Sequence, residues 1–263
     1  MSEMKLTSRQ VAVIAVFAAL YAIVSRLPGI PIIGGAGKIE PVVILDPIVG
    51  ILLGAWIGGL TSLLGNFVAW IIPSVSFYGL LNLPTGPIAA IVSGSLARDT
   101  KNSNWKVSAI VYAVLMALWY LTPTGRAAFY YPFLHWTAFA LILLFRERTY
   151  SFLHAGTTLK KVLGATICSF AGIMANHMTG NLIFIGSVGS FVSLKAIKDT
   201  MKALGFFWLK SGLPSPPEEP LAAVFTFYLP ITIIERMLFT ILTAYLAYGL
   251  MIALRKSGIL RMG

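Results

Sequence analysis

Polar residues within two neighbouring apolar runs are the first candidates for chemistry in this chain. Asp46 begins one run, and Asn66 lies late in the next, four residues before Trp70. A carboxylate inside a bilayer is costly, so Asp46 is expected to face protein or a cavity. Carboxylate and amide groups among apolar side chains are typical of a pocket that orients a small molecule.

Other apolar runs carry polar residues at the same predicted outer half of a bundle. His177 and Asn181 are four residues apart, so they share a helix face, and Asn176 lies beside them. A helix–helix hydrogen bond would explain one such residue, but convergence from several helices favours a binding cavity. The predicted substrate-binding residues are Glu40, Asp46, Asn66, Trp70, Asn82, Trp119, Asn176, His177, Asn181 and Glu235.

Aromatic residues gather at the same predicted end, and they allow two interpretations. Trp119 to Tyr120 and Phe129 to Tyr131 could form the walls of the cavity or the aromatic belt at the membrane surface. Glu235 and Arg236 lie deeper, inside the last apolar run, where an ion pair and a ligand contact are equally good interpretations. His135 could relay a proton only with partners that the sequence does not identify.

Motifs for catalysis are absent from the sequence. It contains no G-x-x-x-x-G-K-[ST] phosphate loop, no H-E-x-x-H and no G-x-S-x-G. Cys168 is the single cysteine, which excludes an internal disulfide and a thiolate metal cluster. We therefore expect a protein that binds a molecule without reacting it, with no metal and no cofactor.

Composition indicates a membrane protein. Of 263 residues, 57% are apolar and 11% are charged, less than half of the roughly 25% charged residues of soluble domains. Apolar runs occupy the whole length, which predicts a single transmembrane domain over 1–263. The net charge of +11 comes from basic residues clustered between the runs, as in cytoplasmic loops, and this argues against nucleic acid as the partner.

Eight apolar runs are candidate spanning helices. Basic residues before the first and after the last run place both termini in the cytoplasm of a multi-pass cell-membrane protein. Some runs are short, so the expected fold is an all-α bundle of six to eight transmembrane helices with an outward-facing substrate cavity. We expect Pro230 to interrupt the last run. The runs are Val11–Val24, Val42–Trp56, Ile57–Ile72, Pro84–Leu96, Val107–Leu121, Ala127–Phe145, Val162–Phe184 and Leu221–Leu254.

The segment 190–210 differs from these runs because its pattern is amphipathic. Phe191, Leu194, Ile197, Met201, Leu204 and Trp208 share one helical face, and Lys195, Lys198 and Lys202 share the other. This predicts a helix at the membrane interface. With a cytoplasmic C-terminus its lysines fall outside, against the usual charge rule. The following 211–220 is a Pro-rich linker, expected to be extended.

Small residues recur at helical spacing in the first and third runs. Ala15, Ala19 and Ala22 lie on closely spaced turns of the first run, which suits packing within the protein and docking to a partner subunit equally well. Gly58, Ser62, Gly65 and Ala69 form a second stripe, which we expect to pack internally.

The alanine-lined first run, the Gly/Pro loop 27–38 and the sequence PIVGILLGAWIGGLTSLLG resemble the substrate-binding (S) components of energy-coupling-factor (ECF) transporters. The resemblance is clearest over 6–98. It implies a subunit that binds a vitamin or related micronutrient from outside and docks on a transmembrane coupling subunit driven by two cytoplasmic ATPases. It also implies that Ala15, Ala19 and Ala22 contact the coupling subunit and that the loop 27–38 caps the substrate.

Two other functions are possible. A stand-alone secondary transporter would be expected to have matching inverted halves, which the sequence does not show. An intramembrane enzyme acting on a lipid-like substrate would use Asp46, His135, His177 or Glu235 as acid or base, but it lacks a nucleophile or metal motif. The sequence does not choose the substrate, and thiamin-like cations, flavins and other micronutrients are all compatible with acids and amides.

Overall fold

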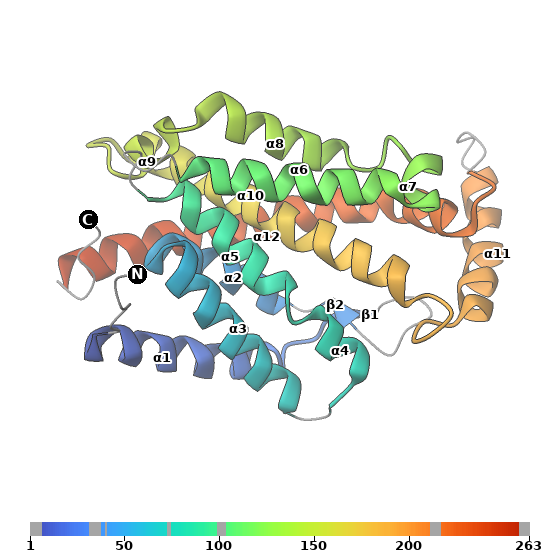
Figure 1. Ribbon diagram of the computed structural model, residues 1–263, viewed down its shortest axis with the longest axis horizontal. Helices are drawn as coiled ribbons and strands as arrows, with labels where there is room; N and C mark the ends of the chain where they lie inside the picture. Colours follow the sequence, from blue (N-terminus) through green and yellow to red (C-terminus); the bar gives the residue numbers. More distant parts are fainter. Residues whose placement is uncertain are drawn as a thin grey trace.

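Helices make up nearly all of the described chain. The structure is a computed structural model that describes residues 7–31, 38–39, 41–72, 75–98, 104–210 and 217–257. Most helices run along one long axis, and the two chain ends lie at the same end of the bundle (Figure 1). The helices are α1 (Ser8–Val24), α2 (Leu45–Leu53), α3 (Ala55–Ile71), α4 (Phe77–Asn82), α5 (Thr85–Leu96), α6 (Trp105–Leu121), α7 (Pro123–Ala127), α8 (Phe133–Phe145), α9 (Arg148–Leu153), α10 (Thr158–Ser187), α11 (Leu194–Lys210) and α12 (Pro220–Lys256). A 3₁₀ turn over Pro41–Ile44 precedes α2, and β1 (Ile30–Pro31) pairs antiparallel with β2 (Lys38–Ile39).

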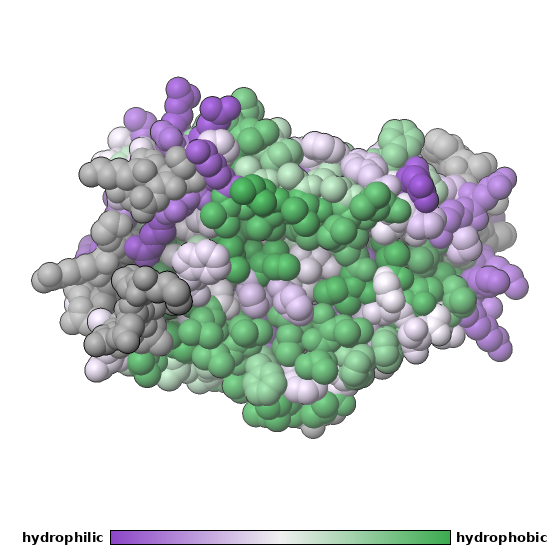
Figure 2. Space-filling view, viewed as in Figure 1, coloured by the Kyte–Doolittle hydropathy of each residue, from purple (hydrophilic) through white to green (hydrophobic). Residues whose placement is uncertain are grey.

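The surface of the bundle has a broad apolar band between two hydrophilic ends (Figure 2). Large apolar side chains point outward along the helices, including Ile110 at 63% and Ile234 at 71% exposure. Within the described part of the chain, three stretches are long and apolar enough to cross a membrane, namely Phe77–Leu96, α10 and α12, and five further apolar helices are shorter. The predicted all-helical membrane fold is confirmed. The count of six to eight spans stays a prediction.

The short helix α2 lies in the middle of the bundle. All nine of its residues are buried, and it packs against α3, α5, α10 and α12. Close approach depends on glycine: a Cβ at Gly50 would collide with the Ala90 carbonyl oxygen, and one at Gly58 would lie 2.7 Å from the Gly50 Cα. The expectation that Gly58 and its stripe pack internally is therefore confirmed for Gly58. A helix enclosed by protein on all sides can be short because it does not meet lipid.

We expect Gly50→Ala to destabilise the protein. The added methyl group would meet backbone of α5, which cannot move aside cheaply, and overpacking of this kind costs about 1–3 kcal/mol. A matched control is Gly59→Ala, whose Cβ would lie 3.1 Å from the flexible Ile91 side chain. Thermal unfolding of the detergent-purified variants should show a clearly lower midpoint for Gly50→Ala. Equal midpoints would show that α2 and α5 can separate without cost.

Gly54 separates α2 from α3. Its φ of +85° is a conformation that L side chains rarely adopt, and a Cβ there would lie 2.6 Å from Nε of Arg98. The two runs are therefore distinct helices, as the sequence predicts, although the break falls at Gly54 and not between Trp56 and Ile57.

The prediction that Pro230 interrupts the last run is wrong. Helix α12 is 37 residues long and runs through Pro230 without a break. Proline removes one backbone donor and usually kinks or breaks a helix, but a long helix in a bundle tolerates it because neighbouring groups re-satisfy the freed backbone.

Both ends of the bundle carry basic residues. Near the chain termini lie α9, which carries Arg148, and the end of α12, which carries Arg255 and Lys256. Helix α11 crosses the opposite end (Figure 1). Its Lys195, Lys198 and Lys202 are exposed and its Ile197 is fully buried, as expected for an amphipathic helix. The side chains of Leu204 and Trp208 lie outside the described residues, as does most of the predicted linker 211–220. The cytoplasmic placement of the termini stays a prediction.

Candidate ligand-binding site

Asp46 joins four helices through its carboxyl group. Its Oδ1 accepts hydrogen bonds from the Tyr21 hydroxyl at 2.7 Å, the Ser62 hydroxyl at 2.6 Å and Nδ2 of Asn66 at 3.0 Å. Its Oδ2 accepts from Nδ2 of Asn176 at 3.2 Å. We call Asp46, Tyr21, Ser62, Asn66 and Asn176 the carboxyl hub. Its donors come from α1, α3 and α10, and the acceptor comes from α2.

The carboxyl hub leaves little room for a ligand. Asp46 is 1% exposed, and a Cβ added to Gly86 of α5 would lie within 2.6 Å of side-chain atoms of Asn66, Ser62 and Asp46. A carboxylate accepts about four hydrogen bonds, and this one already has four. The prediction that Asp46 faces protein or a cavity is confirmed, and the protein itself occupies its hydrogen-bonding capacity.

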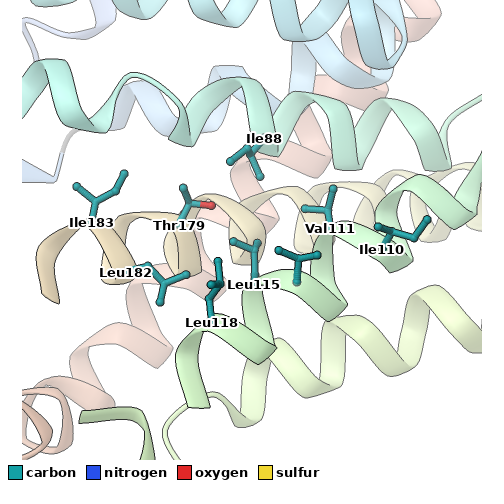
Figure 3. A pocket seen from close by; sticks show the side chains of 9 residues that line it. Ile88, Ile110, Val111, Leu115, Leu118, Thr179, Leu182 and Ile183 are labelled. Atoms are coloured by element: carbon teal, nitrogen blue, oxygen red, sulfur yellow. The ribbon is translucent and has the colours of Figure 1, made fainter. Parts of the chain in front are cut away.

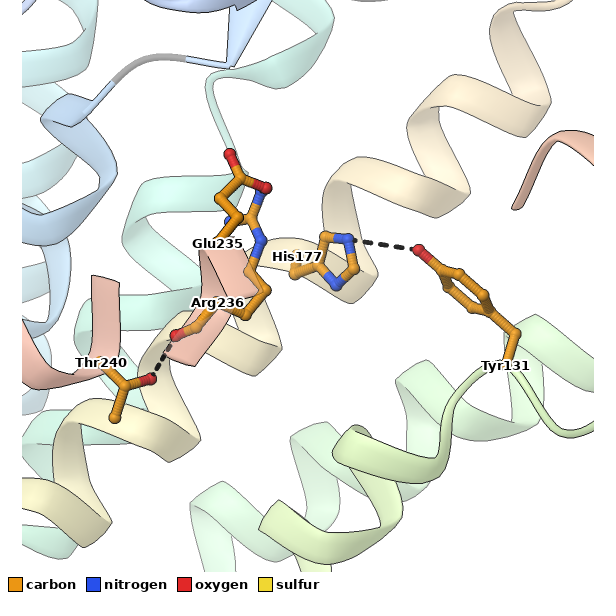
Figure 4. A network of polar contacts seen from close by, with 5 residues as sticks. All are labelled: Tyr131, His177, Glu235, Arg236 and Thr240. Atoms are coloured by element: carbon orange, nitrogen blue, oxygen red, sulfur yellow. Dashed lines mark hydrogen bonds and ion pairs between the residues drawn. The ribbon is translucent and has the colours of Figure 1, made fainter. Parts of the chain in front are cut away.

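A second polar group lies on the other side of α10. His177 follows Asn176 directly, and its Nε2 lies 3.4 Å from the Tyr131 hydroxyl (Figure 4). The His135 ring of α8 stacks on the His177 ring, with centroids 5.2 Å apart and planes inclined by 15°. Tyr131 lies in the turn between α7 and α8, and its side chain is 3% exposed.

The buried ion pair of α12 belongs to this second group. Nη2 of Arg236 donates to Oε2 of Glu235 at 3.0 Å, and the two side chains are 3% and 8% exposed. Figure 4 shows the pair beside His177. The Arg236 charge acts on both His135 and His177, and Asn181 lies near the Tyr131 hydroxyl. We call the group the His–Arg cluster: Trp119, Tyr131, His135, His177, Asn181, Glu235 and Arg236.

Aromatic rings form one wall of the His–Arg cluster. The Trp119 ring lies 5.3 Å from Tyr131 and 5.3 Å from Phe225, and Tyr131 lies 4.9 Å from Phe225. Trp119 and Tyr131 are buried, whereas Phe129 is 67% exposed and Tyr130 is 37% exposed. The exposed rings suit a membrane-surface belt, and burial excludes Trp119 and Tyr131 from it. That these two form the wall of a cavity stays a prediction.

Unpaired polar atoms distinguish the His–Arg cluster from the carboxyl hub. Seven of its buried atoms have no hydrogen-bond partner among the described residues: Nε1 of Trp119, Nδ1 and Nε2 of His135, Nδ1 of His177, Nδ2 of Asn181, Oε1 of Glu235 and Nε of Arg236. Buried polar groups are nearly always satisfied, and each unmet group costs about 1–3 kcal/mol. Half of the fourteen unpaired buried side-chain atoms of the described residues belong to the His–Arg cluster, which makes it the candidate ligand site.

Some predicted site residues lie elsewhere. Nε1 of Trp70 donates to the Ser76 carbonyl at 2.8 Å, and Nδ2 of Asn82 donates to the Tyr78 carbonyl at 2.8 Å, so both serve local turns. Glu40 and residues 32–37 of the predicted capping loop lie outside the described residues. Within those residues, no group of three or more His, Cys, Asp or Glu could hold a metal ion.

An apolar groove of about 520 Å³ opens between α5, α6 and α10 (Figure 3). Its one hydroxyl, that of Thr179, already donates to the Ala175 carbonyl at 2.8 Å. A groove with no polar group to offer suits hydrocarbon better than a polar ligand. It is lined by Ile88, Ile110, Val111, Val114, Leu115, Leu118, Thr179, Leu182 and Ile183.

The alanine face of α1 points away from the bundle. Ala15 and Ala19 are exposed and Ala22 is half-buried, whereas Phe17 and Tyr21 are buried against the neighbouring helices. Of the two interpretations of these alanines, packing within the protein does not apply to Ala15 and Ala19.

Sequence reasoning missed three residues of these groups. Tyr21 lies four residues after Phe17 on the buried face of α1, so its helical spacing was an available signal. Ser62 was recognised only as a small residue. Phe225 carries no signal that separates it from other apolar side chains of α12.

The fold is that of a helical membrane protein with a buried cluster of polar and aromatic side chains between its helices. The model of the family "ECF transporter, substrate-specific component" matches residues 9–251. The chain belongs to this family, which confirms the resemblance. It is 36% identical over 154 residues to an uncharacterized protein of Methanocaldococcus jannaschii, covering 58% of this chain and 50% of that protein. The chain thus spans about half the length of that relative. No solved structure matches.

Proposed function

We propose that this chain captures a vitamin or related micronutrient from outside the cell and delivers it through a transmembrane coupling subunit powered by two ATPases. Family membership supports the role of a substrate-specific membrane subunit. The His–Arg cluster is the proposed binding site, because its unpaired polar atoms and aromatic rings converge from α6, α8, α10 and α12. The carboxyl hub is proposed to position α10, which carries Asn176 and His177 in succession.

Native mass spectrometry of the protein expressed alone tests this proposal. A small molecule at one per chain is the expected result, and its mass would identify the substrate. A matched pair of variants locates it: Asn181→Ala should lose the molecule, and Asn82→Ala should keep it because Asn82 serves a local turn. A bound lipid phosphate in place of a micronutrient would favour an enzyme acting on lipids.

Ala19→Leu should block assembly with the coupling subunit and spare binding of the small molecule. Ala19 is exposed on α1, and a larger side chain would keep a partner helix from approaching closely. Co-purification with a tagged coupling subunit measures the effect. The control is Ala140→Leu, at an exposed alanine of α8. Normal complex formation by Ala19→Leu would remove this face of α1 from the interface.

A further inference from the structure

The unpaired atoms of the His–Arg cluster are mostly hydrogen-bond donors. Nε1 of Trp119, Nδ2 of Asn181 and Nε of Arg236 can only donate. Oε1 of Glu235 accepts when the side chain is ionised. His135 offers one donor and one acceptor, and the one unpaired nitrogen of His177 adds a donor or an acceptor according to its tautomer, so the donors outnumber the acceptors in either case. A ligand that satisfies this site must therefore present more acceptors than donors.

The charge of Arg236 also favours a ligand that offers hydrogen-bond acceptors. Oε2 of Glu235 pairs with Nη2 of Arg236, so the ion pair as a whole is neutral. The guanidinium nevertheless keeps one charged donor without a protein partner among the described residues, at Nε. A carboxylate or carbonyl oxygen would satisfy that donor with a charge-assisted bond. A cationic ligand would bring further donors to a site that already has three donor-only atoms unpaired.

The arrangement of the aromatic rings favours a flat ligand. The rings of Trp119, Tyr131 and Phe225 pack with centroids about 5 Å apart, and the His135 and His177 rings are nearly parallel. Aromatic surfaces of this kind favour stacking and edge contacts with flat rings. The polar and aromatic features lie side by side, because Tyr131 contacts both Trp119 and His177.

We propose that the ligand of the His–Arg cluster is a planar aromatic molecule with a carboxylate- or carbonyl-bearing edge and no positive charge. The inference rests on the proposed function, which places the ligand in this cluster. It selects among the substrate chemistries that the sequence leaves open, because it excludes thiamin-like cations.

Three probes with the same ring test this ligand class: benzoate, benzamide and benzylammonium. They differ in offering an anionic acceptor, a neutral carbonyl or a cationic donor. Their binding to the full-length protein in detergent is measured by ligand-observed NMR, as displacement of any co-purified molecule or directly for protein purified empty. Benzoate or benzamide should bind at least tenfold more tightly than benzylammonium.

A matched pair of tryptophan variants ties the preference to the site. Trp119→Phe keeps an aromatic ring and removes an unpaired donor, so benzoate affinity should fall about tenfold. Trp136→Phe is the control, because Trp136 is 46% exposed and its Nε1 already donates to the Tyr120 hydroxyl at 2.9 Å. Asn181→Leu removes a donor from a different helix and serves the same purpose if Trp119→Phe does not fold.

The outcomes separate this inference from the proposed function. Equal or tighter binding of benzylammonium, or a permanent cation as the co-purified molecule, would overturn the ligand class and leave a binding site in place. An unchanged affinity in both Trp119→Phe and Asn181→Leu would overturn the argument from unpaired donors. A protein that holds no small molecule and binds none of the three probes would contradict the proposed function itself.

Discussion

Replacing Asp46 by alanine is expected to lower the free energy of unfolding by about 3–5 kcal/mol. The change removes the acceptor of four buried donors that belong to α1, α3 and α10. Each donor left unpaired costs about 1–3 kcal/mol, although Nδ2 of Asn66 keeps its bond to the Ser62 carbonyl at 3.0 Å. Thermal unfolding in detergent should show a midpoint lower by roughly 5–15 °C.

Two control variants test whether the loss of stability comes from the buried hydrogen bonds of Asp46. Asp46→Asn keeps the shape and one acceptor oxygen, so it should lose less stability than Asp46→Ala. Asp199→Ala removes an exposed carboxylate of α11 and should leave the midpoint unchanged. If Asp46→Ala unfolds like the wild type and loses the co-purified small molecule, then Asp46 contacts the ligand directly, as the sequence alone predicts.

The features of the fold that depend on neighbouring residues in the sequence were predictable. The apolar runs set the positions of the helices, and the break at Gly54 falls close to the boundary that the sequence places between two short runs. Pro230 shows the limit of local reasoning. Proline disfavours a helix interior, but the helices packed around it determine whether a long helix continues through it. The sequence alone does not identify those neighbouring helices.

The sequence identified the polar residues of the candidate site, but it did not show that they belong to two separate groups, the carboxyl hub and the His–Arg cluster. Asp46, Asn66, Asn176 and His177 were each identifiable as polar residues in apolar runs. The one-residue step from Asn176 to His177 turns the side chain by about 100° around α10, so these two serve different groups. Distances between helices decide which of the two groups keeps unpaired hydrogen-bonding atoms. Residue spacing along the chain does not give those distances.

Two variants of the Glu235–Arg236 pair are expected to distinguish its effect on stability from its effect on ligand binding. Arg236→Met leaves the Glu235 carboxylate buried without its partner, and an uncompensated buried charge costs about 3–5 kcal/mol. The double change of Glu235→Gln with Arg236→Met removes both charges and keeps similar volumes, so it should unfold close to the wild-type midpoint. The double variant should nevertheless lose affinity for the small molecule by about a hundredfold, because the charged donor Nε is gone and the Glu235 carboxylate has become an uncharged amide.

Thermal unfolding and retention of the small molecule are measured on the same samples of both variants. Arg148→Met is the control, because Arg148 is exposed on α9 near the chain termini and should change neither quantity. A double variant that is stable and binds normally would make the ion pair a structural feature alone, and the ligand would then have to be sought elsewhere. A double variant as unstable as Arg236→Met would show that packing around the long side chains, and not their charge, holds α12 in the bundle.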